Sequence, residues 1–278
     1  MAGRNNNALS LQPPKTPPGA RSPLRCKQTR MNIPAAILAK LQQSQRMVVV
    51  TGGGLSAESG VASFRQAMVG EWANYDVRDL ATPQAFARSP KTVWQWYDSR
   101  RRQITAAQPN PAHHALVDLE QHVPEFLLVS LAIDGLHWQA GSRDLIELNG
   151  CVRRVRCVEN GHLGDWDEEG SIPPRCPRCG SLFRPDVVLL GEGFSRSHIV
   201  RARTAVEQCD VILFIGELST ADPIAQFPFM ARRAGATVIT VSRDDSMFAV
   251  TADMHIRDMA SQSIPEIVRV ITSGAGTV

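Results

Sequence analysis

The stretch that most constrains the fold runs from Met47 to Arg65 and reads MVVVTGGGLSAESGVASFR. Met47–Val50 is a short apolar run rich in β-branched residues, which is typical of a buried parallel strand. Thr51 and the three glycines Gly52–Gly54 follow it directly. Glycine tolerates backbone conformations that other residues avoid, so this order predicts a strand that ends in a tight turn.

The residues after the glycines predict the start of a helix. Ser56 is a candidate cap, and Glu58 would lie in the first turn, where acidic side chains are favoured. A strand, a glycine turn and a helix amino terminus together offer backbone N–H groups to a diphosphate. The spacing is not that of the common dinucleotide fingerprint, G-x-G-x-x-G, and glycines after a strand also serve as simple turns.

Composition indicates a globular chain with a separate amino-terminal tail. At 278 residues there is room for one large domain, or for a domain and a small module. Residues 1–30 hold six Lys/Arg, no Asp or Glu and repeated prolines, which predicts a disordered basic tail. It is either a tail with a function of its own or the product of a start assigned upstream of the true one at Met31.

Charge and hydropathy argue against two classes of partner, nucleic acids and membranes. Without residues 1–30 the chain has 24 Lys/Arg and 27 Asp/Glu, so nucleic-acid binding by the folded part is not indicated. No apolar run approaches the roughly 20 residues of a membrane helix, so we expect no membrane partner. The oligomeric state has no signature in the sequence.

Strands and helices alternate along the rest of the chain, which predicts an α/β fold on a parallel sheet. Further strands are predicted at Phe126–Leu131, around Ile146–Leu148, and at Val187–Leu190, Val211–Ile215 and Thr237–Val241. Helices are predicted at Ile33–Gln43, Pro109–Glu120, Thr204–Gln208 and Ile224–Ala234. Residues 66–104, which Pro83 and Pro90 interrupt, predict short helices that form an insert beside the sheet.

A cysteine cluster predicts a small metal module. Cys176 and Cys179 are spaced as C-P-R-C-G, a turn in which two thiolates reach one tetrahedral zinc ion. Cys157 would be a third ligand, but Asn160 stands where a fourth thiolate is expected. His162 is the candidate that completes a Cys₃His site. The alternatives are a metal-free loop and a site completed by water; a redox pair is disfavoured because no thioredoxin-like context surrounds it.

The remaining cysteines indicate a compartment rather than a site. Cys151 and Cys209 lie in or beside predicted strands and helices, where we expect buried thiols, and Cys26 is in the tail. Because thiols and the lack of an apolar signal core suit a reducing environment, we expect a cytoplasmic location.

Several motifs, in a fixed order, resemble those of the sirtuins, the NAD-dependent protein-lysine deacylases. The glycine stretch resembles their T-G-A-G-I-S-x-x-S-G-I-P-x-F-R. IDGLHWQAGS (133–142) resembles I-D-G-L-H-x-x-A-G-S, and IELNGC (146–151) resembles I-E-L-H-G-S. After the CxxC turn, RPDVVLLGE (184–192) resembles R-P-x-V-V-x-F-G-E. The similarity covers about residues 31–275.

This resemblance implies the domain organisation and the cofactors. A Rossmann-like core would comprise about residues 31–64, 105–150 and 185–278, with a helical insert at about 65–104 and a zinc module at about 151–184. An acylated-lysine protein or peptide would bind between the domains, beside NAD. The residues implied to bind NAD are Gly52, Gly53, Gly54, Ser56, Glu58, Phe64, Arg65, Ile133, Asp134, Gly216 and Ser242.

The resemblance also implies a substrate site. Tyr97 and Arg100 match the Y-x-x-R pair by which one sirtuin class binds negatively charged acyl groups such as succinyl, and Ala67 matches the small residue that widens that pocket. A guanidinium fork and a phenol hydroxyl suit a carboxylate. The alternative is that Tyr97 and Arg100 lie on a solvated helix face. The segment with Val188, Gly191 and Glu192 resembles the family's substrate-binding strand.

One departure from the family concerns the general base. The family's E-L-H-G histidine, which draws a proton from a ribose hydroxyl, is Asn149 here. An amide has no lone pair that accepts a proton near neutral pH. Because loss of a general base typically costs about 10²–10⁴ in rate, we expect turnover to be slow or absent.

The other departures lie around the implied cofactor. Leu131 and Ala132 replace two amides of T-Q-N-I-D that contact the ribose and the nicotinamide site. Glu217 and Leu218 replace hydroxyl residues near the phosphates, where a carboxylate would repel a diphosphate. Ser242 stands where the adenosine ribose usually meets an asparagine.

Three functions therefore compete. The first is an NAD-dependent lysine deacylase for acetyl or acidic acyl groups, slow because of Asn149. The second is a non-catalytic protein that binds NAD, ADP-ribose or an acyl-lysine peptide. The third is NAD hydrolysis without deacylation, which needs no base but is weakened by Ala132.

Overall fold

The computed structural model of the chain comprises two units, Met1–Asn32 and Ile33–Val278. The residues that the structure describes are 33–64, 66–166, 172–219 and 222–273, all in the second unit. The predicted tail and the predicted cofactor residue Arg65 lie outside them. Among the described helices, none is both long and apolar enough to span a bilayer.

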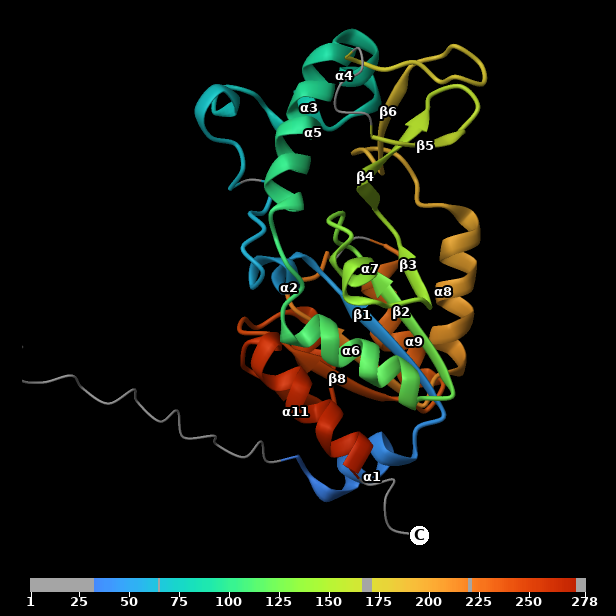
Figure 1. Cartoon of the computed structure of the whole chain (residues 1–278). Helices are drawn as coiled ribbons and strands as arrows, with labels where there is room; N and C mark the ends of the chain where they lie inside the picture. The colour runs from blue at the N-terminus through green and yellow to red at the C-terminus, as the bar shows by residue number, and fades with distance from the viewer. Residues whose placement is uncertain (1–32, 65, 167–171, 220–221, 274–278) are drawn as a thin grey trace, which may run out of the picture. The chain divides into compact units, whose positions relative to one another are not determined.

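The second unit is built on a six-stranded sheet whose neighbouring strands are all parallel (Figure 1). In spatial order the strands are β3 (Leu145–Glu147), β2 (Glu125–Ser130), β1 (Arg46–Thr51), β7 (Val211–Ile215), β8 (Thr237–Val241) and β9 (Met254–Ile256). The five strands from β3 to β8 confirm the predicted apolar runs, because strands buried on both faces consist of continuous apolar residues. The predicted α/β class is confirmed.

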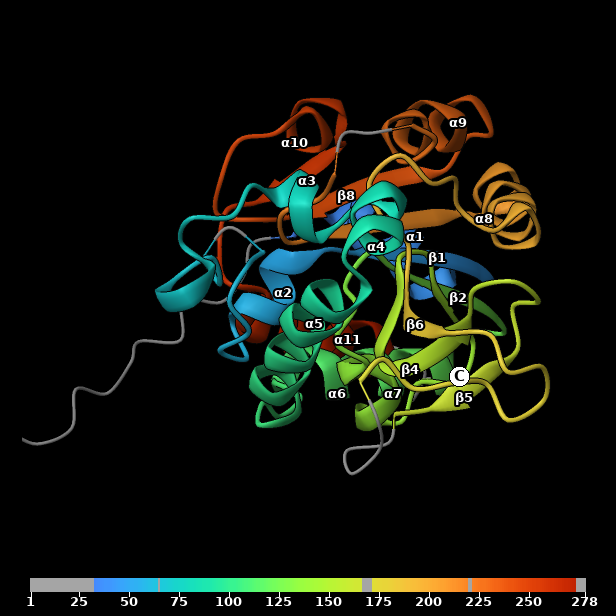
Figure 2. The same cartoon turned by 90° about the horizontal axis from the view of Figure 1, so that it is seen from above.

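Helices cover both faces of this sheet (Figure 2). On one face lie α1 (Ala35–Gln43), α6 (Pro111–His122), α7 (Leu136–Ala140) and α11 (Ala260–Ser273). On the other lie α8 (Arg196–Gln208), η2 (Ile224–Gln226), α9 (Phe227–Arg233) and α10 (Met247–Thr251). Alternate side chains of the strands, such as Val48, Val50 and Phe214, pack with this second group in one buried apolar cluster. Such burial is the main stabilising term for a sheet of this kind.

A second sheet is small and antiparallel, in the order β5 (Leu163–Asp165), β4 (Gly150–Cys157), β6 (Phe183–Val187). The strand predicted at Val187–Leu190 was wrong, because β6 ends at Val187 and pairs with β4 outside the main sheet. Strand β6 was not recognised because it contains polar residues. Among them, buried Asp186 accepts hydrogen bonds from Arg154 at 3.0 Å and Arg156 at 2.8 Å, both on β4.

The predicted helical insert consists of η1 (Gly70–Trp72), α3 (Val77–Leu80), α4 (Pro83–Arg88) and α5 (Pro90–Thr105). The two prolines that interrupt the sequence are the first residues of α4 and α5. Proline is favoured there because the missing N–H would have no partner in the helix. The longest of these helices, α5, packs against β4 and β6 and so connects the insert to the small sheet.

The helix after the glycine turn, α2 (Gly53–Ala57), begins earlier than predicted. Its cap is Gly52, so Ser56 is buried inside the helix and Glu58 follows its last turn. Both carboxylate oxygens of Glu58 accept hydrogen bonds from the first residues of α11, Ala260 N at 2.9 Å and Ser261 N at 2.7 Å. Glu58 therefore caps α11, whose first N–H groups have no partner within that helix.

The glycine turn lies directly against the loop that follows β7. A Cβ atom on Gly52 would be 1.9 Å from the carbonyl oxygen of Glu217, and one on Gly54 would be 2.3 Å from the Glu217 nitrogen. A Cβ on Gly53 would have no heavy atom within 4 Å. Two of the three glycines are thus required by backbone contact, and the third faces open space.

This difference predicts the behaviour of two alanine variants. Gly54→Ala should lower the free energy of unfolding by about 1–3 kcal/mol, because the methyl group must displace a backbone. Gly53→Ala is its matched control and should be neutral, since it fills open space at a helical position. Urea denaturation measures both. Equal losses in the two variants would contradict the contact with Glu217.

Candidate functional site

The residues implied to bind NAD lie at the carboxyl ends of four adjacent strands. Gly52–Gly54 follow β1, Ile133 and Asp134 follow β2, Gly216 follows β7 and Ser242 follows β8. The strand order reverses between β1 and β7, since β2 and β3 extend the sheet on one side and β8 and β9 on the other. Ligands of open α/β sheets bind in the crevice at such a reversal.

The glycine turn has the donors that a diphosphate needs. Gly53 and Gly54 are the first two residues of α2, so their N–H groups have no acceptor within the helix. The open space at Gly53 leaves room for a group to approach that backbone. The Glu217 side chain is exposed to solvent, which screens its charge, while its peptide group packs on the turn.

Two buried histidines lie beneath this turn. His137 Nε2 is 2.9 Å from the hydroxyl of Thr51, and the rings of His137 and His113 are 4.7 Å apart. Burial lowers the pKa of His113 to about 4 and the pKa of His137 well below its usual value. Both imidazoles are therefore neutral near pH 7, and His137 contacts the residue that directly precedes the turn.

Sequence reasoning missed Asn110, an asparagine that connects His113 to α2. Asn110 caps α6 in a reciprocal capping box with His113, and its amide also donates to Leu55 O at 3.0 Å and Ser59 Oγ at 3.1 Å. The signal was present as Asn110-Pro111 ahead of an apolar helix, a common start sequence. Its second role could not be read from the sequence, because its partners lie more than 50 residues earlier.

Asn149, at the position of the general base, is half-buried and held in place. Its side-chain amide donates to Leu131 O at 2.7 Å, and its backbone carbonyl accepts from Val188 N at 2.9 Å. Leu131 is 8% exposed and belongs to the apolar core of the main sheet. An apolar side chain thus occupies a position beside the site where the family has an amide.

Two other predicted cofactor residues make their polar contacts within the protein. The Ser242 hydroxyl donates to Asp244 O at 2.8 Å and is 3.2 Å from His255 Nε2. Asp134 is 3% exposed, and one of its carboxyl oxygens accepts from Leu136 N at 2.8 Å.

The residues of the predicted acyl site lie in a buried apolar cluster formed from three segments. Ala67 and Tyr97 belong to one buried cluster with Trp96 of α5 and with Val187 and Leu189 at the end of β6. The predicted cofactor residues Phe64 and Ile133 pack against the same cluster. The structure thus brings the predicted acyl residues next to predicted cofactor residues.

Arg100 is the charged residue on the same face of α5 as Tyr97. It is 5% exposed, and its guanidinium donates to Ala62 O at 2.7 Å and to Gln103 Oε1 at 3.0 Å. Both acceptors are neutral. Burial lowers the pKa of Arg100 and raises the pKa of Tyr97, which is 4% exposed. The alternative of a solvated helix face for this pair was wrong.

The predicted substrate segment follows β6. Glu192 pairs with Arg184 through both carboxylate oxygens, at 2.6 and 2.8 Å, and accepts from Leu189 N at 2.8 Å. Its carboxylate therefore shapes the loop that contains Gly191. A cleft of about 660 Å³ is lined by Leu148, Gly150, Val188, Glu192 and Phe194, among others.

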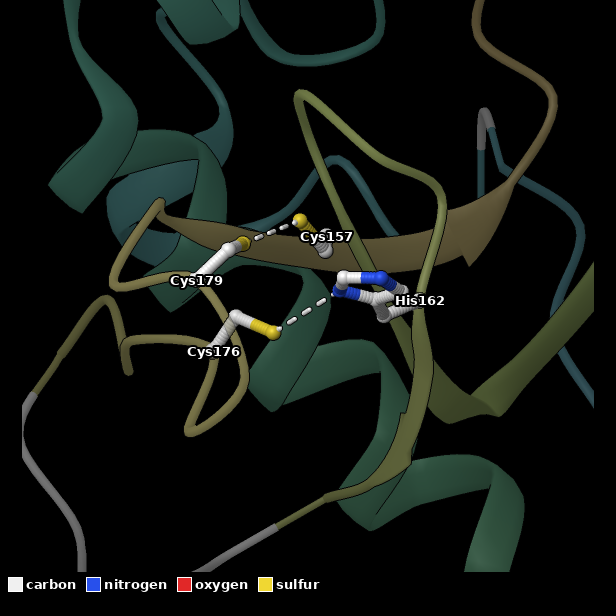
Figure 3. A group of neighbouring side chains, drawn as sticks. All are labelled: Cys157, His162, Cys176 and Cys179. Atoms are coloured by element: carbon white, nitrogen blue, oxygen red, sulfur yellow. Dashed lines mark hydrogen bonds between the residues drawn. The ribbon is translucent and has the colours of Figure 1, made fainter.

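The predicted metal ligands form one cluster (Figure 3). The ligand atoms of Cys157, His162, Cys176 and Cys179 all lie within 4.8 Å of one another. Cys157 Sγ is 3.3 Å from Cys179 Sγ, and Cys176 Sγ is 3.4 Å from His162 Nδ1. These separations suit a tetrahedral zinc site, whose bonds are about 2.0–2.3 Å long. Asn160 donates its backbone N–H to Cys157 Sγ at 3.4 Å.

Comparison with known proteins gives a consistent result. The sequence pattern of the Sir2 family matches residues 52–223. An NAD-dependent protein deacylase of Aquifex aeolicus is 39% identical over 227 residues, which cover 81% of this chain and 95% of that protein. A protein of the same name from Aeropyrum pernix is 40% identical over 230 residues, with coverages of 82% and 94%.

Solved structures agree with the sequence comparisons. A complex of a Sir2 homologue with NAD has a TM-score of 0.80 at 36% identity, covering 87% of this chain and 95% of that one. A mutant Sir2 homologue in complex with ADP-ribose has a TM-score of 0.80 at 35% identity, covering 88% and 99%. The chain belongs to the Sir2 family, whose relatives named here are NAD-dependent protein deacylases.

Proposed function

We propose that this protein binds NAD and removes acidic acyl groups, such as succinyl, from lysine side chains of other proteins in the cytoplasm, with slow turnover. The observation that carries the proposal is Arg100, a buried guanidinium whose partners in the structure are neutral oxygens. A buried charge is costly unless an opposite charge compensates it. A carboxylate at the end of an acyl chain would supply that charge.

The surroundings of Arg100 support a carboxylate ligand. Tyr97 lies three residues earlier on α5 and adds a hydroxyl donor, because burial keeps its phenol protonated. Ala67, in the same buried cluster as Tyr97, would leave more room for an acyl chain than a larger residue. A guanidinium and a phenol form charge-assisted hydrogen bonds with a carboxylate but gain little from the methyl group of an acetyl.

The NAD site fits the proposal in part. The N–H groups of Gly53 and Gly54 would hold the diphosphate, and buried Asp134, which follows β2, would accept from the nicotinamide amide. Bound NAD would supply the ribose carbon that takes the acyl oxygen in the reaction of this family. Leu131 and Ala132 offer no side-chain hydrogen bonds at the nicotinamide end of NAD. That end would therefore contribute little to the binding free energy.

Acyl selectivity is the first test. Calorimetry should show that a succinyl-lysine peptide binds at least about tenfold more tightly than its acetyl counterpart, since a hydrogen-bonded ion pair contributes about 1.5–3 kcal/mol. Arg100→Met should abolish this preference. Arg102→Met is the control, because that side chain is 70% exposed. Wild-type preference for acetyl, or an unchanged preference in Arg100→Met, would reject acidic-acyl recognition.

Turnover is the second test. Because Asn149 accepts no proton, single-turnover deacylation by the wild type should be at least about 10²-fold slower than by a relative with histidine at this position. Asn149→His alone should recover little, and Asn149→His with Leu131→Gln and Ala132→Asn should recover more. Robust multiple turnover by the wild type would show that another group serves as the base.

A second candidate function is a binding protein without catalysis. It is favoured by the hydrogen bond from the Asn149 amide to Leu131 O, which commits that side chain to the scaffold. In this case NAD and ADP-ribose would bind with similar affinity, and the triple variant would stay inactive. The turnover experiment therefore separates the two candidates.

We also propose that the cysteine–histidine cluster binds a structural zinc ion, which would tie the loops of the small sheet together. The purified chain should contain about one zinc, and His162→Ala should retain less, as atomic absorption measures. His114→Ala, at an exposed position on α6, is the control. Asn160→Cys added to His162→Ala should restore retention. Full zinc content in His162→Ala would remove His162 from the site.

A further inference from the structure

Helix α5 contacts two different clusters with two faces. Tyr97 and Trp96 belong to the buried cluster around Ala67 described above, here called the acyl cluster. Trp94 belongs to a second cluster with Val155, Cys157, Cys176 and Phe183, here called the metal cluster. Residues 93, 97, 100 and 104 are three or four apart and share one face, while 94 and 101 are seven apart and share another.

Trp166 packs against both clusters. Its ring stacks on that of Trp94, with centroids 4.3 Å apart and planes inclined by 21°. The guanidinium of Arg101 lies over the Trp166 ring, 5.1 Å from its centroid. Stacked rings and a cation over an aromatic face each add attraction beyond simple burial.

Two of the metal ligands lie beside the strand that leads to Trp166. His162 precedes β5 and Cys157 ends β4, and Cys157 N donates to His162 O at 2.8 Å. Strand β5 pairs with β4 in the register Arg156 to Leu163, and Trp166 follows β5 immediately. An ion held by Cys157 and His162 would therefore fix the strand that delivers Trp166 to α5.

We propose that Trp166 is a positioning residue that couples the metal cluster to the acyl pocket. Its stack on Trp94 and Arg101 holds the rotation of α5, and that rotation sets where Tyr97 and Arg100 lie. The coupling deepens the proposed function, since the pocket it positions is the proposed site for acidic acyl groups. Loss of zinc would then weaken acyl recognition without contact between the ion and the substrate.

Hydrogen–deuterium exchange of the full-length protein tests the coupling without any substrate. In the wild type, a zinc chelator should accelerate exchange in residues 90–105 by about fivefold to tenfold, the equivalent of losing the stacking and cation–π contacts. Trp166→Ala should show this acceleration with zinc bound, and the chelator should then add little. Trp166→Phe should behave like the wild type, and Trp138→Ala, an exposed tryptophan on α7, is the control.

Peptide affinity gives a second readout. Trp166→Ala should weaken binding of a succinyl-lysine peptide by about fivefold to tenfold and an acetyl-lysine peptide less, with rescue by Trp166→Phe. The coupling is overturned if the chelator leaves the exchange rate of α5 unchanged in the wild type. It is also overturned if the chelator accelerates exchange in Trp166→Ala as much as in the wild type. If the wild type binds neither peptide, the proposed function fails while the exchange experiment still decides the coupling.

Discussion

The contact between the glycine turn and the loop after β7 is the constraint on which the rest of the site depends. It brings the backbone of Gly52 and Gly54 against the peptide group of Glu217, so the ends of two neighbouring parallel strands meet without side chains between them. This is the point where the strand order reverses. Because β1 and β7 are central strands, the helices on both faces pack around that contact.

Support for this contact comes from distant parts of the chain. The His113–His137 pair and the Thr51 hydroxyl lie beneath the turn, Asn110 holds the end of α2, and Glu58 connects α2 to α11. These contacts do not involve Leu131, Ala132 or Asn149, positions where this sequence departs from the family's motifs.

The sequence predicted best those strands that are covered by helices on both faces. The apolar runs of β1, β7 and β8 were predicted because a parallel strand covered on both faces has no polar alternation to obscure it. By the same logic β4 was missed: its sequence, GCVRRVRC, contains arginines whose charges are neutralised by Asp186 and Glu147. Such ion pairs join segments that are separate in the sequence, so local sequence patterns do not predict them.

Within the site, motif resemblance predicted which residues come together better than local rules predicted their roles. The four metal ligands lie together as expected, and Ala67 and Tyr97 lie in one buried cluster. Glu58, in contrast, was expected in the first turn of a helix, and it instead caps a helix about 200 residues away. Trp166 carried no recognisable signal, because its importance lies in touching two clusters at once.

The treatment of buried charge gives the strongest physical argument about function. Among the described residues, Glu147, Asp186 and Arg101 are buried, and each forms an ion pair. Arg100 and Asp134 are equally buried, yet hydrogen bonds to neutral groups are the interactions that the structure gives them. The other buried charges named here each have an ion-pair partner, so a bound ligand is the expected partner for Arg100 and Asp134. Arg100 lies where the acyl group would end and Asp134 where nicotinamide would bind, so these two buried charges fit the proposed recognition of both ligands.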